Sequence, residues 1–202
     1  TLKAFTKNKY KLVGIDPAGA KFRKYYRRDI KLIPDFFSSK KFQKHFKDKK
    51  AKLITSFSMF YDLDSPLQFM KDVSNILSKD GIWVFEQSYM PLMLKMNSYD
   101  TVCHEHKEYY ALQQIKWMTD RSDLKIIDVS FNDINGGSFS VTVAHLDNQI
   151  KENLSVEKIL NNERKKNLDN IETYKSFSKR VKNLKKDFNK FLNKTKKEKK
   201  TV

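Results

Sequence analysis

Short apolar segments alternate with helical patterns along residues 10–87, and this alternation limits the fold more than any other feature of the chain. Strands buried on both faces form nearly continuous apolar runs, and helical crossovers link parallel strands. The pattern therefore predicts an α/β fold with a mostly parallel sheet and helices on both faces. The expected strands lie within residues 10–17, 30–38, 51–63 and 82–87.

The clearest helix is expected over residues 65–81. Ser65 is suited to the N-cap, Pro66 to the first helical position, and Gly81 to the position after the helix ends. Weaker patterns predict helical stretches at residues 18–26 and 112–122 and a helix or loop at 42–50. Residues 124–133 and 138–146 are expected to form paired strands joined through "INGG".

The C-terminal part of the chain differs in character from the rest. Beyond residue 150 we expect one long amphipathic helix with a Lys-rich solvent face, because apolar residues recur every three or four positions from Leu168 to Phe191. The chain is therefore divided into a Rossmann-like domain, residues 1–150, and a basic helical segment, residues 151–202.

Composition narrows the class of protein. The 202 residues are 39% hydrophobic and 32% charged, typical of a globular protein, and no apolar run is long enough to span a membrane. The single cysteine, Cys103, excludes internal disulfides and cysteine-rich zinc sites and predicts a cytoplasmic setting. We assign this thiol no nucleophilic role.

The net charge of +17 is uneven, since residues 151–202 hold 17 Lys and Arg against 7 Asp and Glu. Such a balance can indicate nucleic-acid binding. The excess is Lys scattered among Asn, which favours a solvated surface instead. One alternative therefore stays open: a non-catalytic basic module that binds RNA or another polyanion, with steeply salt-dependent affinity.

The stretch "YDTVCHEHKEYY", residues 99–110, concentrates chemically active side chains. A metal site is not favoured, because no third ligand is evident near His104 and His106. A proton-transfer site fits better, since a histidine can act as a base near neutral pH. Polar residues also follow each expected strand end, where ligands bind in parallel α/β sheets; these are Asp16, Asp35, Ser56 and Glu86.

Several motifs together resemble a known family. "GIDP" and "IPDFFS" each end a strand with an acid, as in class I S-adenosylmethionine-dependent methyltransferases. More specifically, "FEQSYMPLMLKMNSYDTVCHEHKEYYAL" followed by "GGSFSVTV" resembles the deoxysugar C-methyltransferase family. That family shows an E-x-x-Y strand end, a Y/F-D-x-x-x-x-E-H motif and a later H/N-G-G-S. The resemblance covers residues 10–146.

The resemblance implies S-adenosylmethionine as cofactor. Asp16 would accept both ribose hydroxyls, although an acid before Pro17 can also be a simple turn residue. Asp35 would accept the adenine amino group and Phe36 would lie against the ring, or both would be ordinary turn and core residues. Ser56 and Phe57 would line the cofactor, mainly through their backbone.

The resemblance also implies a set of catalytic residues. His106 would be the base that removes a sugar C–H proton, and Glu105 would orient it or bind a sugar hydroxyl. Tyr89 would donate a hydrogen bond to substrate, or pack at the core boundary. Tyr61 stands where relatives often carry His, and His104 where relatives vary. Backbone at Asn135–Gly137 would approach the sugar, or form only a hairpin turn.

The implied function is C-methylation of a nucleotide-linked keto-deoxysugar through an enolate. A methyltransferase with another acceptor, such as RNA, is the second alternative. Two family features have no counterpart here, the cysteine-rich zinc module and the glycine-rich loop after the first strand. We therefore expect an internal fragment, whose isolated form can be inactive. Its final "KKTV" would begin the first strand of a missing C-terminal domain.

Overall fold

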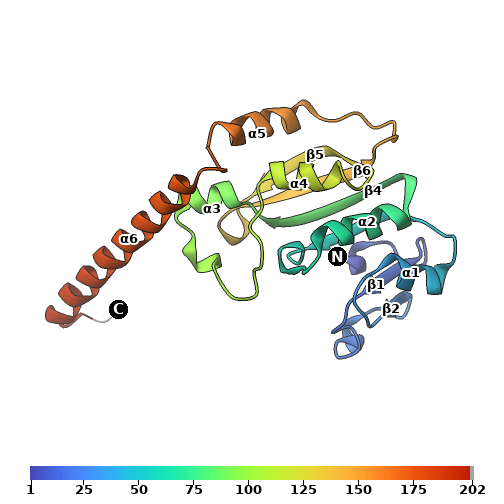
Figure 1. Cartoon of the computed structure of the whole chain (residues 1–202). Coiled ribbons are helices and arrows are strands. Elements are labelled where there is room, and N and C mark those ends of the chain that lie inside the picture. The colour runs from blue at the N-terminus through green and yellow to red at the C-terminus, as the bar shows by residue number, and fades with distance from the viewer. Residues whose placement is uncertain (201–202) are drawn as a thin grey trace. The chain divides into compact units, whose positions relative to one another are not determined.

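The computed structural model describes residues 1–200 and divides the chain into two compact units, Thr1–Lys50 and Ala51–Val202 (Figure 1). Each unit is described by itself below. The strand expected to start in "KKTV" includes Thr201 and Val202, which lie outside the described residues. The expected domain boundary at residue 150 stays a prediction.

The first unit contains a two-stranded parallel sheet formed by β1 (Leu12–Ile15) and β2 (Ile30–Ile33). Helix α1 (Ser39–Phe46) follows, and its N-cap residue Ser38 accepts a hydrogen bond from the Lys41 amide. A two-stranded sheet with one helix buries little apolar surface. This unit is therefore a small structure built around two strands.

The helical stretch expected at residues 18–26 is wrong. These residues form turns and then the short 3₁₀ helix η2 (Arg23–Tyr25). Asp16 accounts for the difference, because its carboxylate accepts the Ala18 amide at 2.8 Å and its carbonyl accepts the Gly19 amide at 2.9 Å. Such local hydrogen bonds favour a turn over a helix.

The second unit is built on a four-stranded sheet of order β3-β4-β6-β5. Strand β3 (Ala51–Phe57) runs parallel to β4 (Leu77–Ser88). Strand β6 (Ser138–His145) pairs antiparallel with both β4 and β5 (Leu124–Asn132). The expected pairing of the two late strands is confirmed, and η5 (Ile134–Gly136) makes the connection.

One face of this sheet carries the core. Trp83 and Phe85 of β4 are fully buried and lie opposite Val143 and Val141 of β6, because alternate residues of a strand share a face. Helix α2 (Pro66–Ile76) covers this face, with the Phe69 ring centroid 6.0 Å from that of Trp83. Helix α4 (Leu112–Thr119) packs beside α2 and against β5 (Figure 1).

Helix α2 starts where expected and ends earlier. Ser65 is its N-cap residue and Pro66 its first residue, as predicted. The expected end at residue 81 is wrong: the helix stops at Ile76, and Leu77 begins β4. Leu77 pairs with Ala51 of β3, so strand pairing overrides the helical pattern. Gly81 consequently lies inside β4.

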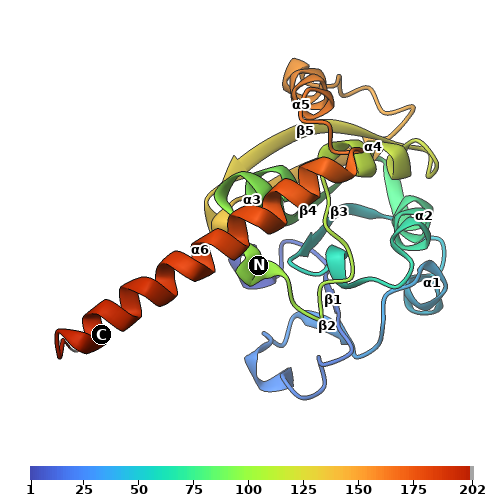
Figure 2. The same cartoon turned by 60° about the vertical axis from the view of Figure 1, so that its left-hand side comes forward.

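The described part of the basic C-terminal segment, residues 151–200, contains two helices, α5 (Leu154–Arg164) and α6 (Ile171–Lys197). The long amphipathic helix is confirmed as α6, but Leu168 lies in the turn before it. Figure 2 shows α6 passing α3 (Met90–Met96), where Arg180 donates to the Leu94 carbonyl and the Asn97 side chain. No helix within residues 1–200 is both long and apolar enough to cross a membrane.

Candidate functional site

Asp16 and Asp35 lie at the carboxyl ends of β1 and β2. These neighbouring strands end in register, with Ile15 opposite Ile33. The amides of Asp16 and Asp35 both donate to the Ile33 carbonyl, at 3.1 and 2.9 Å. The structure thus brings these two predicted cofactor residues to one sheet edge.

The Asp16 carboxylate already has one local donor. It accepts the Ala18 amide at 2.8 Å, and the Tyr26 phenol lies close enough for the charge of Asp16 to act on it. Burial, together with the charge of Asp16, raises the pKa of Tyr26, so this phenol keeps its proton at neutral pH. A carboxylate offers about four lone-pair sites, so Asp16 can still accept ribose hydroxyls.

Asp35 is an ionised acceptor beside an exposed aromatic ring. Its hydrogen bond from the Lys41 ammonium lowers the pKa of the carboxyl, and it also accepts the Phe36 amide at 2.8 Å. The Phe36 side chain is 72% exposed at this edge. Carboxylates can accept the ribose hydroxyls and the adenine amino group of an adenosine, and an unburied ring can lie against its base, so the residues of this unit are compatible with S-adenosylmethionine.

In the second unit, the end of β3 presents Ser56 and Phe57 on opposite faces. The Ser56 hydroxyl accepts the Trp83 indole N–H at 3.0 Å, on the core face. Phe57 is exposed on the other face, and Ser58 then turns the chain with a positive φ of 50°. The Ser58 amide donates to the Glu86 carbonyl at 2.9 Å, which keeps this turn at the end of β4.

Tyr61 and His106 are brought together. Tyr61 belongs to η3 (Phe60–Asp62), and its buried ring lies with its centroid 4.4 Å from that of His106. The Tyr61 carbonyl accepts the Lys107 and Glu108 amides at 3.0 and 3.1 Å. The loop that carries His106 is therefore docked on η3 through both backbone and ring contacts.

The tautomer of His106 follows from its neighbour. Its Nδ1 lies 2.8 Å from the Thr101 carbonyl oxygen. A carbonyl can only accept, so Nδ1 carries the hydrogen in this contact and Nε2 holds the lone pair of the neutral ring. The Tyr109 hydroxyl donates to the same carbonyl at 3.3 Å. The ring orientation of His106 is thus fixed, with Nε2 as its basic nitrogen.

His104 and Glu105 lie on the exposed side of this loop. The His104 side chain is 92% exposed, and its Nε2 lies 3.3 Å from a Glu105 carboxylate oxygen. Cys103 beside them is also exposed. Residues 1–200 contain no group of three His, Cys, Asp or Glu side chains placed to hold a metal ion. The pair is not packed against His106 in the way that Tyr61 is.

Tyr89 is placed differently from the other predicted catalytic residues. It is only 6% exposed, and its hydroxyl donates to Glu163 at 2.6 Å. Burial raises the pKa of this phenol, and the Glu163 carboxylate raises it further. The hydroxyl proton therefore has a protein acceptor, and the predicted hydrogen bond to substrate stays a prediction.

Two acidic residues were not selected from the sequence. The pKa of Asp62 is raised, mainly by burial. His106, Glu105 and Lys107 also act on it in opposing directions, so Asp62 lies within electrostatic reach of the loop. Its position next to Tyr61 was the available signal. Glu163 is buried on α5, and nothing in its neighbourhood in the sequence distinguishes it from exposed acids of the basic segment.

Comparison with known proteins identifies the family. A family model described as a methyltransferase domain matches residues 1–129. The chain belongs to the methyltransferase domain family. A second model, described as the C-methyltransferase C-terminal domain, matches residues 133–202. These matches confirm the prediction of an S-adenosylmethionine-dependent methyltransferase that resembles the C-methyltransferases.

One curated relative of this methyltransferase chain is the C-methyltransferase NovU of Streptomyces niveus. The two are 26% identical over 169 residues, which cover 83% of this chain and 40% of NovU. The chain thus spans less than half the length of that relative.

Solved structures confirm the predicted fold class. The PH0226 protein of Pyrococcus horikoshii has a TM-score of 0.52 and 10% identity, covering 68% of this chain and 72% of its own. A SAM-dependent methyltransferase of Anabaena variabilis has a TM-score of 0.50 and 10% identity, covering 67% and 68%. At such low identity these likenesses concern the fold alone.

Proposed function

We propose that this methyltransferase methylates a carbon next to the carbonyl of a nucleotide-linked keto-deoxysugar, through an enolate. The observation that carries the proposal is His106, whose Nδ1–H is held by the Thr101 carbonyl so that Nε2 is free to act as a base. The likeness to a C-methyltransferase supports the choice of carbon as acceptor. Glu105, directly before His106, completes the proposed E-H pair.

The chemistry asked of these residues is proton transfer. His106 Nε2 would take the C–H proton, while the electron pair of that bond moves into the carbonyl to give the enolate. Tyr61, whose ring contacts His106 at an interplanar angle of 53°, would fix the imidazole plane. Glu105 would bind a sugar hydroxyl or orient the base, and His104 and Tyr89 stay as proposed substrate contacts. S-adenosylmethionine, when bound, supplies an electrophilic methyl group.

The residues proposed to hold the cofactor are divided by role. Asp16 would accept the ribose hydroxyls, Asp35 the adenine amino group, and Phe36 would lie against the adenine ring. Ser56 and Phe57 are proposed to line the cofactor from the end of β3. All five come from strand ends, the usual place for ligands in α/β folds.

Calorimetric titration of S-adenosylhomocysteine tests the cofactor site. Asp16→Ala should weaken binding by about 1–3 kcal/mol, because charge-assisted hydrogen bonds to the ligand are lost. Asp48→Ala is the matched control, since Asp48 is an exposed acid of the same unit. Equal weakening by both variants would argue against a ribose contact at Asp16.

Hydrogen exchange of the substrate tests the proposed base. In D₂O, with S-adenosylhomocysteine present, the chain should exchange the acidic C–H of a nucleotide-linked keto-deoxysugar without methylating it. His106→Asn can still donate to Thr101 but lacks a basic nitrogen, so exchange should fall about 100-fold or more. His45→Asn, an exposed histidine on α1, is the control. Undiminished exchange in His106→Asn would reject His106 as the base.

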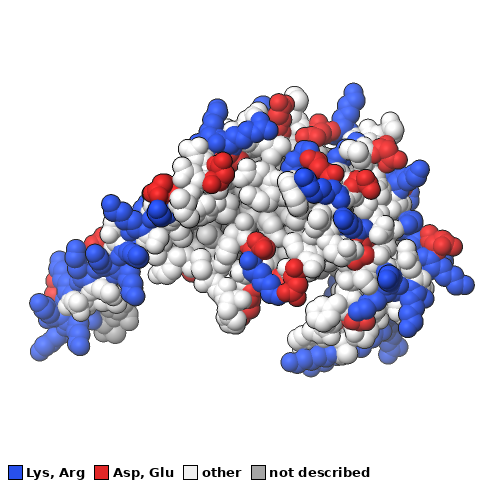
Figure 3. All heavy atoms as spheres, in the orientation of Figure 1, with Lys and Arg blue, Asp and Glu red and all other residues white. Residues whose placement is uncertain are grey.

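A basic surface favours one alternative. Figure 3 shows Lys and Arg side chains crowded over α6, in agreement with the charge of this segment. A non-catalytic polyanion-binding role would give an RNA affinity that falls steeply as the salt concentration rises. Asp16→Ala would leave that affinity unchanged. A methyltransferase with another acceptor would instead retain cofactor binding but show no exchange of the keto-sugar proton.

A further inference from the structure

Glu163 is the most deeply buried acid that the proposed mechanism does not use. Its side chain lies on α5 with no exposed surface. The carboxylate accepts three hydrogen bonds: Tyr89 hydroxyl at 2.6 Å, Leu112 amide at 2.8 Å and Gln113 amide at 2.9 Å. Three donors satisfy a buried carboxylate, so Glu163 is a hydrogen-bonded part of the core rather than an unpaired buried charge.

These three donors flank the segment that carries His106. Tyr89 immediately precedes α3, whereas Leu112 and Gln113 are the first two residues of α4. The chain between them, residues 90–111, forms α3 and the His106 loop. One carboxylate therefore holds both ends of residues 90–111. The Met90 amide donates to the Tyr110 carbonyl at 2.9 Å and so also joins the two ends of this segment.

Glu163 also replaces a missing helix cap. The N-cap residue of α4 is Ala111, whose methyl group cannot accept a hydrogen bond. The amides of Leu112 and Gln113 would otherwise be unpaired at a helix start. The Glu163 carboxylate satisfies them and places a negative charge at the positive end of the helix. The start of α4, six residues after His106, is thus fixed from α5.

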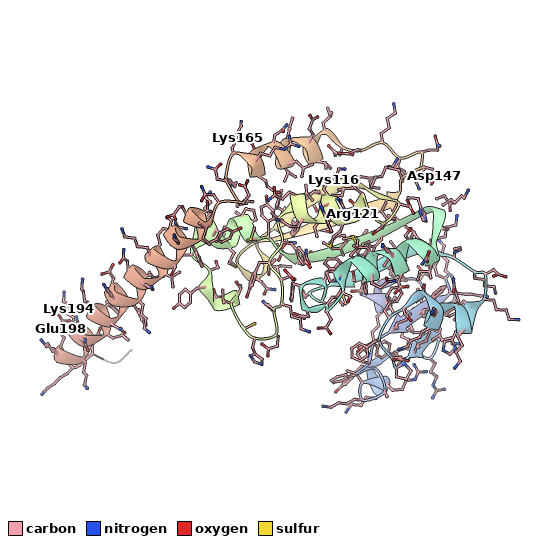
Figure 4. The ribbon with its side chains drawn as sticks, viewed as in Figure 1. Lys116, Arg121, Asp147, Lys165, Lys194 and Glu198 are labelled. Atoms are coloured by element: carbon pink, nitrogen blue, oxygen red, sulfur yellow. The ribbon has the colours of Figure 1, made fainter. Side chains whose placement is uncertain are left out.

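We propose that Glu163 is a positioning residue that fixes the His106 loop against Tyr61 by holding both ends of residues 90–111. The proposal rests on the proposed function, because it assigns the loop a base at His106. Glu163 itself touches neither cofactor nor substrate; it acts through Tyr89 and the start of α4. Figure 4 labels Lys165, which directly follows α5 and lies two residues after Glu163, and Lys116 on α4.

The decisive variant is Glu163→Gln. Glutamine keeps the volume and one acceptor, but its NH₂ group cannot accept the amide hydrogen that the second carboxylate oxygen accepts. Glu157→Gln is the matched control, since Glu157 is an exposed acid of the same helix and loses the same charge. Amide hydrogen–deuterium exchange of the whole chain is measured for residues 97–111 and, as reference, for β4 and β6.

Glu163→Gln should raise exchange in residues 97–111 about tenfold while β4 and β6 keep their protection, and Glu157→Gln should change neither. Unchanged exchange in residues 97–111 would overturn the proposal. If Glu163→Gln fails to fold, Tyr89→Phe replaces it. This variant removes the Tyr89 donor but leaves the hydrogen bonds between the Glu163 carboxylate and the start of α4. Tyr89→Phe should raise exchange in the same segment about threefold, and no rise would again overturn the proposal.

The keto-sugar proton exchange assay supplies the functional readout. Glu163→Gln should lower its maximal rate at least about tenfold with little change in S-adenosylhomocysteine affinity, because the base is misplaced while the cofactor residues are untouched. A looser loop with an unchanged rate would overturn the positioning role. A wild-type chain that does not exchange the proton would count against the proposed function, and the amide exchange result would still decide whether Glu163 holds the loop.

Discussion

At the scale of single residues, Tyr89 shows how burial changes the meaning of a motif. Its spacing from Glu86 matches a family pattern, yet its hydroxyl group donates its hydrogen bond to Glu163. Burial and this carboxylate raise the pKa of Tyr89 above its ordinary value near 10. In the folded chain the phenol therefore stays protonated at pH values where an exposed tyrosine ionises.

This pKa shift predicts a loss of stability in alkali. Below pH 10 the contribution of Tyr89 is fully present, because the group is protonated in both states. As the pH rises from about 10 toward the folded-state pKa, the unfolded state loses the proton first, and the free energy of unfolding falls. Wild type should lose about 1.4 kcal/mol more per pH unit than Tyr89→Phe. Urea titrations between pH 9 and 11 measure this, and parallel slopes would refute it.

The sequence could indicate some site residues and not others, for a physical reason. Asp16, Asp35 and His106 stand in local patterns that survive folding, namely strand ends and a two-residue E-H pair. Glu163 acquires its role only from contacts with residues at least 50 positions away. No local pattern encodes such a contact, so the acid looks like any other on a basic helix.

At the scale of elements, the boundary between α2 and β4 shows the same limit. The apolar spacing of residues 65–77 is helical throughout, and Gly81 has the position of a helix terminator. Pairing of Leu77 with Ala51 converts the last residues to strand instead. At Gly81 a Cβ atom would lie 2.9 Å from the Ala51 carbonyl oxygen. The glycine is thus needed for close strand approach rather than for a helix end.

Gly81→Ala should accordingly destabilise the second unit. The added methyl group meets a backbone oxygen that cannot move without disturbing β3, so a cost of about 1–3 kcal/mol is expected in chemical denaturation. Lys79→Ala, at an exposed position of the same strand, should cost less than about 0.5 kcal/mol. If the two variants unfolded at the same denaturant concentration, the close approach at Gly81 would be disproved.

The contact between α6 and α3 gives a second element-scale prediction. Arg180 donates to the Asn97 side chain at 2.8 Å and to the Leu94 carbonyl at 2.6 Å, at the end of α3. Arg180→Ala should destabilise the chain by about 1 kcal/mol and speed amide exchange around residue 98. Lys182→Ala, an exposed cation of the same helix, serves as control. Equal amide exchange around residue 98 in both variants would show that the contact from α6 does not stabilise the end of α3.

At the scale of the whole molecule, the two units should differ in stability. Alternating strands and helices sufficed to predict the fold class, because apolar periodicity is local. It could not predict that residues 1–50 form a separate two-stranded sheet, since strand partners are chosen by tertiary contacts. Such sheets are marginal alone. Amides of β1 and β2 should therefore exchange at least about 100-fold faster than those of β4 and β6, and equal protection would contradict this.

The single cysteine has a practical consequence. Cys103 is exposed and lies three residues before His106, in the loop whose ends Glu163 holds. A thiol-reactive fluorophore would attach at that one position of the natural sequence, with no engineered residue. Its emission anisotropy would then follow the motion of the loop directly, as cofactor or sugar nucleotide is added.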